Sequence, residues 1–73
     1  MPVTKENLDD VFTYHAPKDD QPTRYANIRT ACKAAAAAIL DNTEKGADQQ
    51  AAIRHIREAM MTANASIATN NAV

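Results

Sequence analysis

Two separate stretches of this chain carry apolar residues at alternating spacings of three and four positions, and this pattern constrains the fold most strongly. The first stretch comprises Tyr25, Ile28, Cys32, Ala35 and Ile39, and the second comprises Ile53, Ile56, Met60, Ala63 and Ile67. Such spacing forms one apolar seam along a helix that packs on a partner helix. Two helices with matching seams and a short link pack antiparallel, so the sequence predicts an all-α antiparallel helical hairpin.

The first long helix is predicted over about residues 20–41. Either Asp19 or Asp20 can accept the free backbone N–H groups at its start, and Pro22 is tolerated in a first turn. The alanine run at 34–38 adds strong helix propensity.

The second long helix is predicted over about residues 44–69. Thr43 is in a position to cap it, with Glu44 favourable near its positive end. Gly46 weakens the first turn, so a later start is the alternative.

Residues 1–20 form a polar, acidic lead. Thr4 can cap a short helix over about residues 5–12. The following segment is expected to be extended, because Pro17 disfavours helical backbone at Ala16. We therefore expect a short N-terminal helix or an extended lead before the hairpin.

The 73 residues are expected to form one domain, 1–73, which is small enough to be only marginally stable alone. Alanine supplies much of its apolar content and buries little area, and the single cysteine, Cys32, allows no internal disulfide. We therefore expect a homo-oligomer. The net charge of −1 argues against binding to a nucleic-acid polymer, and the longest apolar run, 34–40, is too short to span a bilayer. A free thiol and a polar N-terminus favour the cytoplasm.

The sequence contains no pattern typical of catalysis or metal binding. It has no glycine-rich phosphate loop, and neither His15 nor His55 has a cysteine pair beside it. Its paired aspartates, such as Asp9 and Asp10, are adjacent and diverge on a helix, so they are expected to be solvated. The sequence therefore predicts a protein that is not an enzyme and has neither a metal nor a cofactor.

Only cations occur among the charged residues from Gln21 to Leu40, namely Arg24, Arg29 and Lys33. Arg29 and Lys33 are four residues apart and would repel each other if unpaired. Acidic residues of the lead, on the same or a neighbouring chain, or solvent can neutralise them. The alternative is a phosphate-bearing ligand, which matches the planar fork of arginine.

Four further side chains have alternative interpretations. Phe12 is expected to pack in a core, and His15 to make a local hydrogen bond. Tyr14 lies in a segment too polar for a core, so it is equally suited to stacking on a planar base or to a hydrogen bond. Asn64 lies near the second seam and can fix the register or contact a ligand, register being favoured.

Three ordered segments of the chain resemble the hairpin domain shared by two phage immune-evasion sponges. The segments are Phe12-Thr-Tyr14-His15-Ala-Pro17, then Gln21-Pro-Thr-Arg24-Tyr25-Ala-Asn-Ile28-Arg29, and Ala63-Asn64-Ala65-Ser-Ile67-Ala68. One sponge counters CBASS by binding cyclic oligonucleotides, and the other counters Thoeris by holding cyclic ADP-ribose-like signals. The resemblance covers roughly residues 11–70.

This resemblance implies a protein that sequesters a cyclic nucleotide messenger in the host cytoplasm without cleaving it. It also implies a homo-oligomer, typically a hexamer, with ligands between chains. Tyr14 would then stack on a base or form a pocket wall. Arg24 and Arg29 match the Arg-Tyr-x-x-Ile-Arg pattern and would hold phosphates or inter-chain contacts, with Lys18 and Asn64 as further ligand candidates.

The chain departs from these relatives near the end of the second helix. Thr62 stands where relatives often carry tryptophan, and Thr69 where they often carry arginine. These changes remove an aromatic ring and a cation from any second ligand site there. The alternative function is a helical oligomerisation or adaptor module without a small-molecule ligand, in which the arginines pair with acids across chains.

Overall fold

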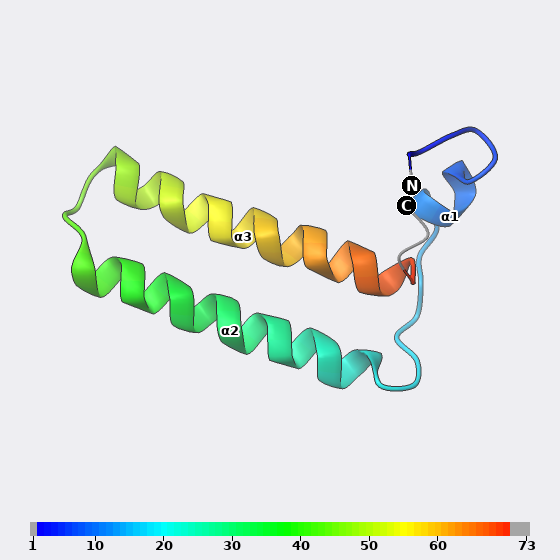
Figure 1. Ribbon diagram of the computed structural model, residues 1–73, viewed down its shortest axis with the longest axis horizontal. Coiled ribbons are helices and arrows are strands. Elements are labelled where there is room, and N and C mark those ends of the chain that lie inside the picture. Colours follow the sequence, from blue (N-terminus) through cyan, green and yellow to red (C-terminus); the bar gives the residue numbers. More distant parts are fainter. Residues whose placement is uncertain (1, 71–73) are drawn as a thin grey trace.

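The computed structural model describes residues 2–70, so residue 1 and residues 71–73 of the predicted 1–73 domain lie outside the described residues. Over the described range the chain forms three helices and no strand: α1 (Leu8–Phe12), α2 (Gln21–Asn42) and α3 (Ala47–Ala68). The two long helices lie antiparallel along an elongated body of 46 × 27 × 17 Å (Figure 1). The predicted all-α hairpin with a short N-terminal helix is confirmed.

The two apolar seams face each other across the hairpin. Each seam residue is at least half-buried, whereas the small residues Ala31, Ala34 and Ala38 on another side of α2 are exposed. Within residues 2–70 only one apolar side chain, Ile67, is buried, at 7% exposure, and none is fully buried. The spacing of three and four residues therefore gave the correct interface, but one chain encloses very little dry core.

Helix α2 begins and ends close to the predicted positions. Asp20 precedes its first residue, but its side chain makes no capping hydrogen bond. The Asp20 carboxylate instead lies 3.8 Å from the Arg24 guanidinium, so the acidic lead does neutralise this arginine. At the other end, Asn42 Nδ2 donates to the Ala38 carbonyl, one turn earlier in the helix, at 2.8 Å.

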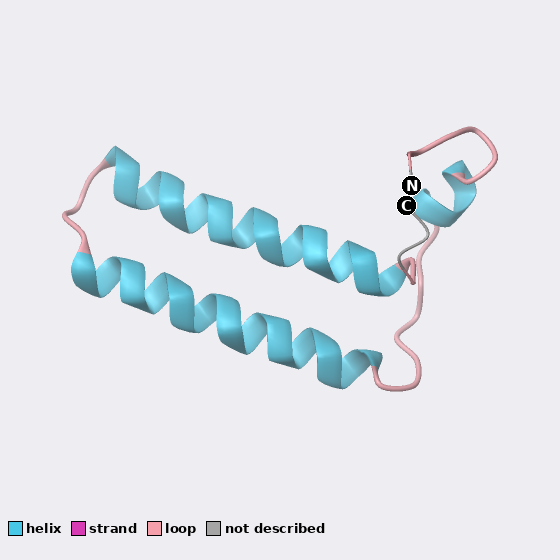
Figure 2. Cartoon of the chain, viewed as in Figure 1, coloured by secondary structure: helices cyan, strands magenta, loops and turns pink. Residues whose placement is uncertain are grey.

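The prediction that Thr43 caps the second helix was wrong, and the later start is confirmed. Thr43 is the C-cap of α2 and has extended backbone, while Gly46 precedes α3. The Thr43 hydroxyl donates to the Ile39 carbonyl at 2.6 Å, so it stabilises the C-terminal end of α2, and Thr43 is not the N-cap of α3. Loop residues 43–46 then separate the helices (Figure 2).

Helix α1 is shorter than predicted and begins after Asn7 rather than after Thr4. The Asn7 side chain accepts the Thr4 N–H at 2.7 Å and donates to the Pro2 carbonyl at 3.1 Å, which holds a turn ahead of the helix. The expectation that Phe12 packs in a core was also wrong, because its side chain is 80% exposed. Helix α1 lies apart from both long helices, so no apolar surface of the hairpin covers this ring.

Candidate functional site

A hollow of about 430 Å³ lies at the open end of the hairpin, and we call it the end pocket. The segment between α1 and α2 passes beside the last turn of α3 and forms this pocket with it (Figure 1). The pocket is lined by Asp10, Tyr14, His15, Ala16, Lys18, Gln21, Ala68, Thr69 and Asn70. Two of the predicted ligand residues, Tyr14 and Lys18, are therefore brought together.

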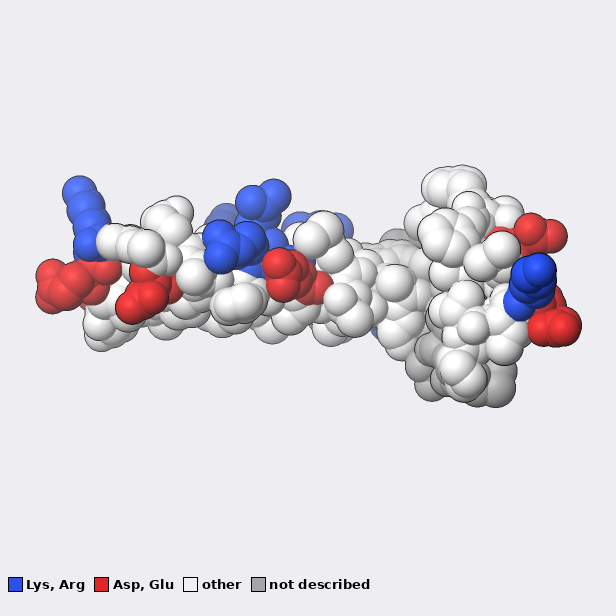
Figure 3. All heavy atoms as spheres, turned by 90° about the horizontal axis from the view of Figure 1, so that it is seen from above, with Lys and Arg blue, Asp and Glu red and all other residues white. Residues whose placement is uncertain are grey.

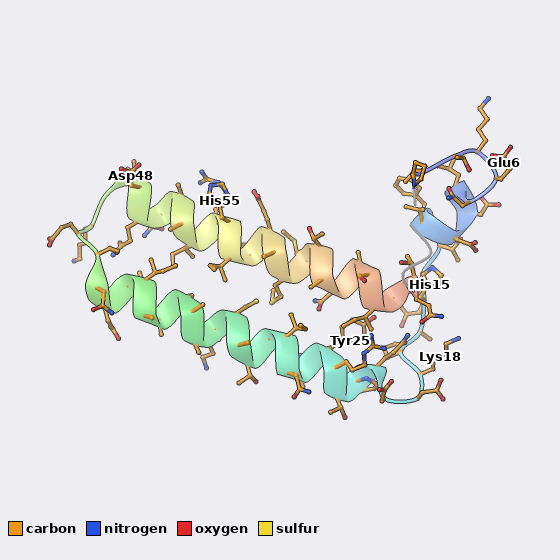
Figure 4. The ribbon with its side chains drawn as sticks, viewed as in Figure 1. Glu6, His15, Lys18, Tyr25, Asp48 and His55 are labelled. Atoms are coloured by element: carbon orange, nitrogen blue, oxygen red, sulfur yellow. The ribbon has the colours of Figure 1, made fainter. Side chains whose placement is uncertain are left out.

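Hydrogen bonds hold the connecting segment in this position. The Gln21 carboxamide accepts the Lys18 backbone N–H at 3.1 Å and donates to the Ile67 carbonyl at 3.0 Å. His15 donates its Nε2–H to the Asp10 carbonyl at 2.6 Å, which confirms the predicted local role of this histidine. His15 and Lys18 lie in the segment beside the end of α3, while Tyr25 lies at the start of α2 (Figure 4).

The end pocket combines an aromatic ring, a cation and hydrogen-bond acceptors. The Tyr14 side chain is 82% exposed, so its ring is free to stack on a planar group. Lys18 is also exposed and supplies a positive charge. Asp10 and Ala68 also line the pocket, so a carboxylate and a carbonyl of the last turn of α3 are available there as acceptors for the N–H groups of a ligand.

A second hollow, of about 150 Å³, lies between the middles of the long helices, and we call it the basic groove. Its floor is apolar, and three cations rim it: Arg29 and Lys33 from α2, and Arg57 from α3. Within residues 2–70 these three side chains make no ion pair. Lys and Arg atoms also gather over the middle of the molecule in the space-filling view (Figure 3). The hollow is lined almost wholly by apolar atoms, so an anion would meet these cations at its edge and not inside it.

The other two predicted ligand residues lie apart from both hollows. Arg24 borders a third hollow, of about 390 Å³, with Ile28 and Ala63, and is paired with Asp20. Asn64 is half-buried, and its Oδ1 atom is buried without a hydrogen-bond partner in the described part of the chain. One chain thus separates Arg24, Arg29 and Asn64 from Tyr14 and Lys18.

The part of the chain that the structure describes contains no group of three or more His, Cys, Asp or Glu residues placed to hold a metal ion. It also contains no helix long and apolar enough to cross a membrane. Hydrogen bonds from its own backbone N–H and from the Thr4 side chain lower the pKa of Glu6, which lies in the lead away from the end pocket (Figure 4).

Gln21 was not predicted to be a site residue. Gln21 is buried, at 6% exposure, although glutamine is usually exposed. A signal existed in the sequence, because a glutamine stands in the first turn of each long helix, Gln21 in α2 and Gln49 in α3. In an antiparallel hairpin, these positions adjoin the carbonyl end of the partner helix.

A family model described as Acb2/Tad1, hairpin domain, matches residues 4–68. The match includes all three helices and both predicted seams. No curated protein and no solved structure matches the chain.

Proposed function

The chain belongs to the Acb2/Tad1 hairpin-domain family, the family of anti-CBASS and anti-Thoeris sponge proteins, and we propose that it sequesters a cyclic nucleotide second messenger of bacterial defence. It would bind a CBASS-type cyclic di- or trinucleotide, or a Thoeris-type cyclic ADP-ribose isomer, without cleaving it. Removing this messenger in the cytoplasm of the host cell would keep the defence effector silent while a phage replicates. The observation that carries the proposal is the family match over nearly the whole chain.

The chemistry of the two hollows supports the binding of different parts of such a ligand, the base in one hollow and the phosphates at the other. The end pocket offers the Tyr14 ring and several acceptors, which suit a purine base with its N–H groups. The basic groove offers Arg29, Lys33 and Arg57, which suit phosphate oxygens. A cyclic nucleotide presents both kinds of group, whereas neither hollow alone serves both equally well.

The separation of these hollows supports a ligand held between chains. Arg29 follows Gln21 by eight residues, which is about 12 Å along the axis of α2. A second chain that docks beside the end pocket would bring its own cations to the phosphates of a base held by Tyr14. Arg24 and Asn64 would then contribute to the ligand or to the inter-chain contacts around it.

The small dry core of one chain supports self-association. Phe12, Leu40 and Met61 are exposed, and Ile67 is the single buried apolar residue in the described range. Burying exposed apolar side chains against other copies would add the stability that a short chain lacks. We propose a homo-oligomer, with the hexamer typical of such sponges as the first expectation.

Sequestration needs affinity and no reactive group. The charge-assisted hydrogen bonds of arginines to phosphates are among the strong polar contacts available to proteins. We therefore propose that the chain is not an enzyme and that its partners are the messenger and its own copies, without a cofactor, a nucleic-acid polymer or a membrane.

The exposed apolar residues also support the second candidate function, a helical oligomerisation or adaptor module. In that case Arg29, Lys33 and Arg57 would pair with acidic residues of neighbouring chains. The two functions differ in whether the assembled protein retains a nucleotide.

Native mass spectrometry of the purified protein tests the proposal. The protein is incubated with cyclic di-AMP, cyclic tri-AMP, cyclic GMP-AMP and cyclic ADP-ribose isomers. A sponge is expected to form an oligomer that gains intact nucleotide masses in a fixed ratio to its subunits. An oligomer that binds none of these compounds would contradict the sponge function and favour the adaptor function.

A further inference from the structure

Two buried glutamines cap the helices of this hairpin reciprocally. Gln21, at the start of α2, donates its Nε2–H to the Ile67 carbonyl near the end of α3 at 3.0 Å. Gln49, at the start of α3, donates to the Thr43 carbonyl at the end of α2 at 3.4 Å and to the Thr43 hydroxyl at 3.1 Å. Their exposures are 6% and 7%. Each glutamine side chain therefore links the start of its own helix to the end of the partner helix. At Ile67, Gln21 shares the carbonyl with the Asn70 backbone N–H, which lies 3.1 Å from the same oxygen.

Only one of the two glutamines also touches the end pocket. The Gln21 Oε1 atom accepts the Lys18 N–H at 3.1 Å, and the Gln21 N–H donates to the Lys18 carbonyl at 2.9 Å. Gln21 lines the end pocket with Tyr14 and Lys18, whereas Gln49 lies at the opposite end of the hairpin in a separate hollow with Thr43. One carboxamide thus joins the segment that carries the predicted ligand residues to the last turn of α3.

The position of the segment between α1 and α2 depends on the two Gln21 side-chain hydrogen bonds, because little else attaches residues 2–20 to the hairpin. Helix α1 packs on neither long helix, and the histidine bond from His15 to Asp10 stays within the lead. A buried carboxamide that loses both partners leaves a donor and an acceptor unsatisfied, so both bonds favour the same arrangement.

We infer that Gln21 is a positioning residue for the ligand: its carboxamide holds Tyr14 and Lys18 against the end of α3 in the arrangement that receives a base. The inference rests on the proposed function, because it takes the end pocket as part of the messenger site. Gln21 acts through the segment it holds, and its own contact with the ligand is not required.

The test compares Gln21→Met with Gln49→Met in the full chain. Both changes keep the shape of the side chain and remove every carboxamide hydrogen bond, so both are expected to lower the thermal midpoint. Binding is measured by calorimetry with cyclic di-AMP, cyclic tri-AMP and cyclic ADP-ribose as probes. If Gln21→Met leaves the binding-competent segment populated about one tenth of the time, the affinity falls about tenfold. Gln49→Met is expected to leave affinity within about twofold of the unmodified chain, since it loosens the far end only.

A second measurement reads the positioning without any nucleotide. Amide hydrogen exchange and NMR spectra of the free protein are expected to show faster exchange at Lys18 and shifted Tyr14 ring signals in Gln21→Met, and neither change in Gln49→Met. Gln21→Glu places a carboxylate oxygen against the Ile67 carbonyl at a buried position, so at neutral pH it is expected to lower the thermal midpoint at least as much as Gln21→Met and to shift the signals of the last turn of α3.

Two results would overturn the inference. One is an equal loss of affinity in Gln21→Met and Gln49→Met, which would reflect stability alone. The other is unchanged Lys18 exchange and Tyr14 signals in Gln21→Met. If the unmodified chain binds none of the probes, the proposed function fails, and the spectra alone decide whether Gln21 positions the segment.

Discussion

Gln49 donates its carboxamide N–H to the hydroxyl of Thr43 at 3.1 Å, across the turn that joins the two long helices. The same hydroxyl donates to the Ile39 carbonyl at 2.6 Å, so Thr43 links the end of α2 to the start of α3. This turn therefore depends on one hydroxyl that both accepts and donates. The arrangement leads to a prediction about stability that is independent of any ligand.

Replacing Thr43 by valine is expected to lower the free energy of unfolding by about 1–2 kcal/mol, because two hydrogen bonds are lost and the Gln49 donor is left poorly satisfied. Valine keeps the β-branched shape and the extended backbone of Thr43, so the change reports the hydroxyl alone. Urea denaturation followed by circular dichroism measures the effect. Thr62→Val, at an exposed position of α3, is the control and is expected to change stability by less than about 0.5 kcal/mol. An equal effect of both changes would show that the Thr43 hydroxyl contributes nothing specific.

The thermal midpoint is expected to rise with protein concentration, by about 5 °C for each tenfold increase, because association stabilises the folded chain by mass action. The physical reason is the small dry core of one chain and the exposure of Phe12 and Met61. Differential scanning fluorimetry over a hundredfold concentration range, with native mass spectrometry beside it, checks the prediction. A midpoint that does not depend on concentration, together with a monomer mass, would contradict self-association.

The hairpin itself could be predicted because the residues that a helix buries recur in the sequence at the helical period. The seam residues Ile28 and Ile56 recur at helical spacing, and the structure buries these seams against each other. The helix ends were less predictable, since Thr43 has the chemistry to begin one helix or to end another. Its hydroxyl donates to the Ile39 carbonyl, so Thr43 ends α2. Which of the two helices a threonine caps depends on backbone geometry that a local sequence pattern does not specify.

Residues whose role depends on distant partners could not be predicted locally. Gln21 can be buried because its side-chain N–H donates to the carbonyl of Ile67, a residue 46 positions away in the sequence. Phe12 was expected in a core because aromatic rings are usually covered, yet no surface of its own chain covers it. Of the predicted ligand residues, Tyr14 and Lys18 lie together, because both occur in the segment that Gln21 fixes beside α3. The roles of all five candidates stay predictions.

Tyr14→Ala is expected to weaken binding of a cyclic nucleotide by about 10- to 100-fold, because stacking of a base on an aromatic side chain contributes about 1–3 kcal/mol. Tyr14→Phe keeps the ring and is the matched variant. If it binds as the unmodified chain does, the ring stacks. If it loses as much affinity as Tyr14→Ala, a hydrogen bond of the hydroxyl is responsible instead. Neither change is expected to alter the thermal midpoint of the free chain by more than about 2 °C, since the ring is 82% exposed. Isothermal calorimetry and scanning fluorimetry supply the two measurements.

Arg29→Ala is expected to weaken nucleotide binding by about 100-fold or more while leaving the oligomer assembled. Removing one partner of a desolvated, charge-assisted contact costs about 2–5 kcal/mol, and each tenfold in affinity corresponds to about 1.4 kcal/mol. Within residues 2–70, Arg29 makes no ion pair whose loss would destabilise the free chain. Calorimetry, thermal melting and native mass spectrometry of one preparation measure affinity, stability and subunit number together.

Arg54→Ala is the matched control for Arg29→Ala, because Arg54 is an exposed cation on α3 that does not line the basic groove. It lowers the net charge equally, so a long-range electrostatic effect would weaken binding in both variants and would fall with added salt. If Arg29→Ala instead dissociates the oligomer or lowers its thermal midpoint, the arginine pairs with an acid of a neighbouring chain, as the adaptor function requires. If it changes neither binding nor assembly, then both roles assigned to Arg29 are wrong, and Lys33 and Arg57 become the cations to test in the basic groove.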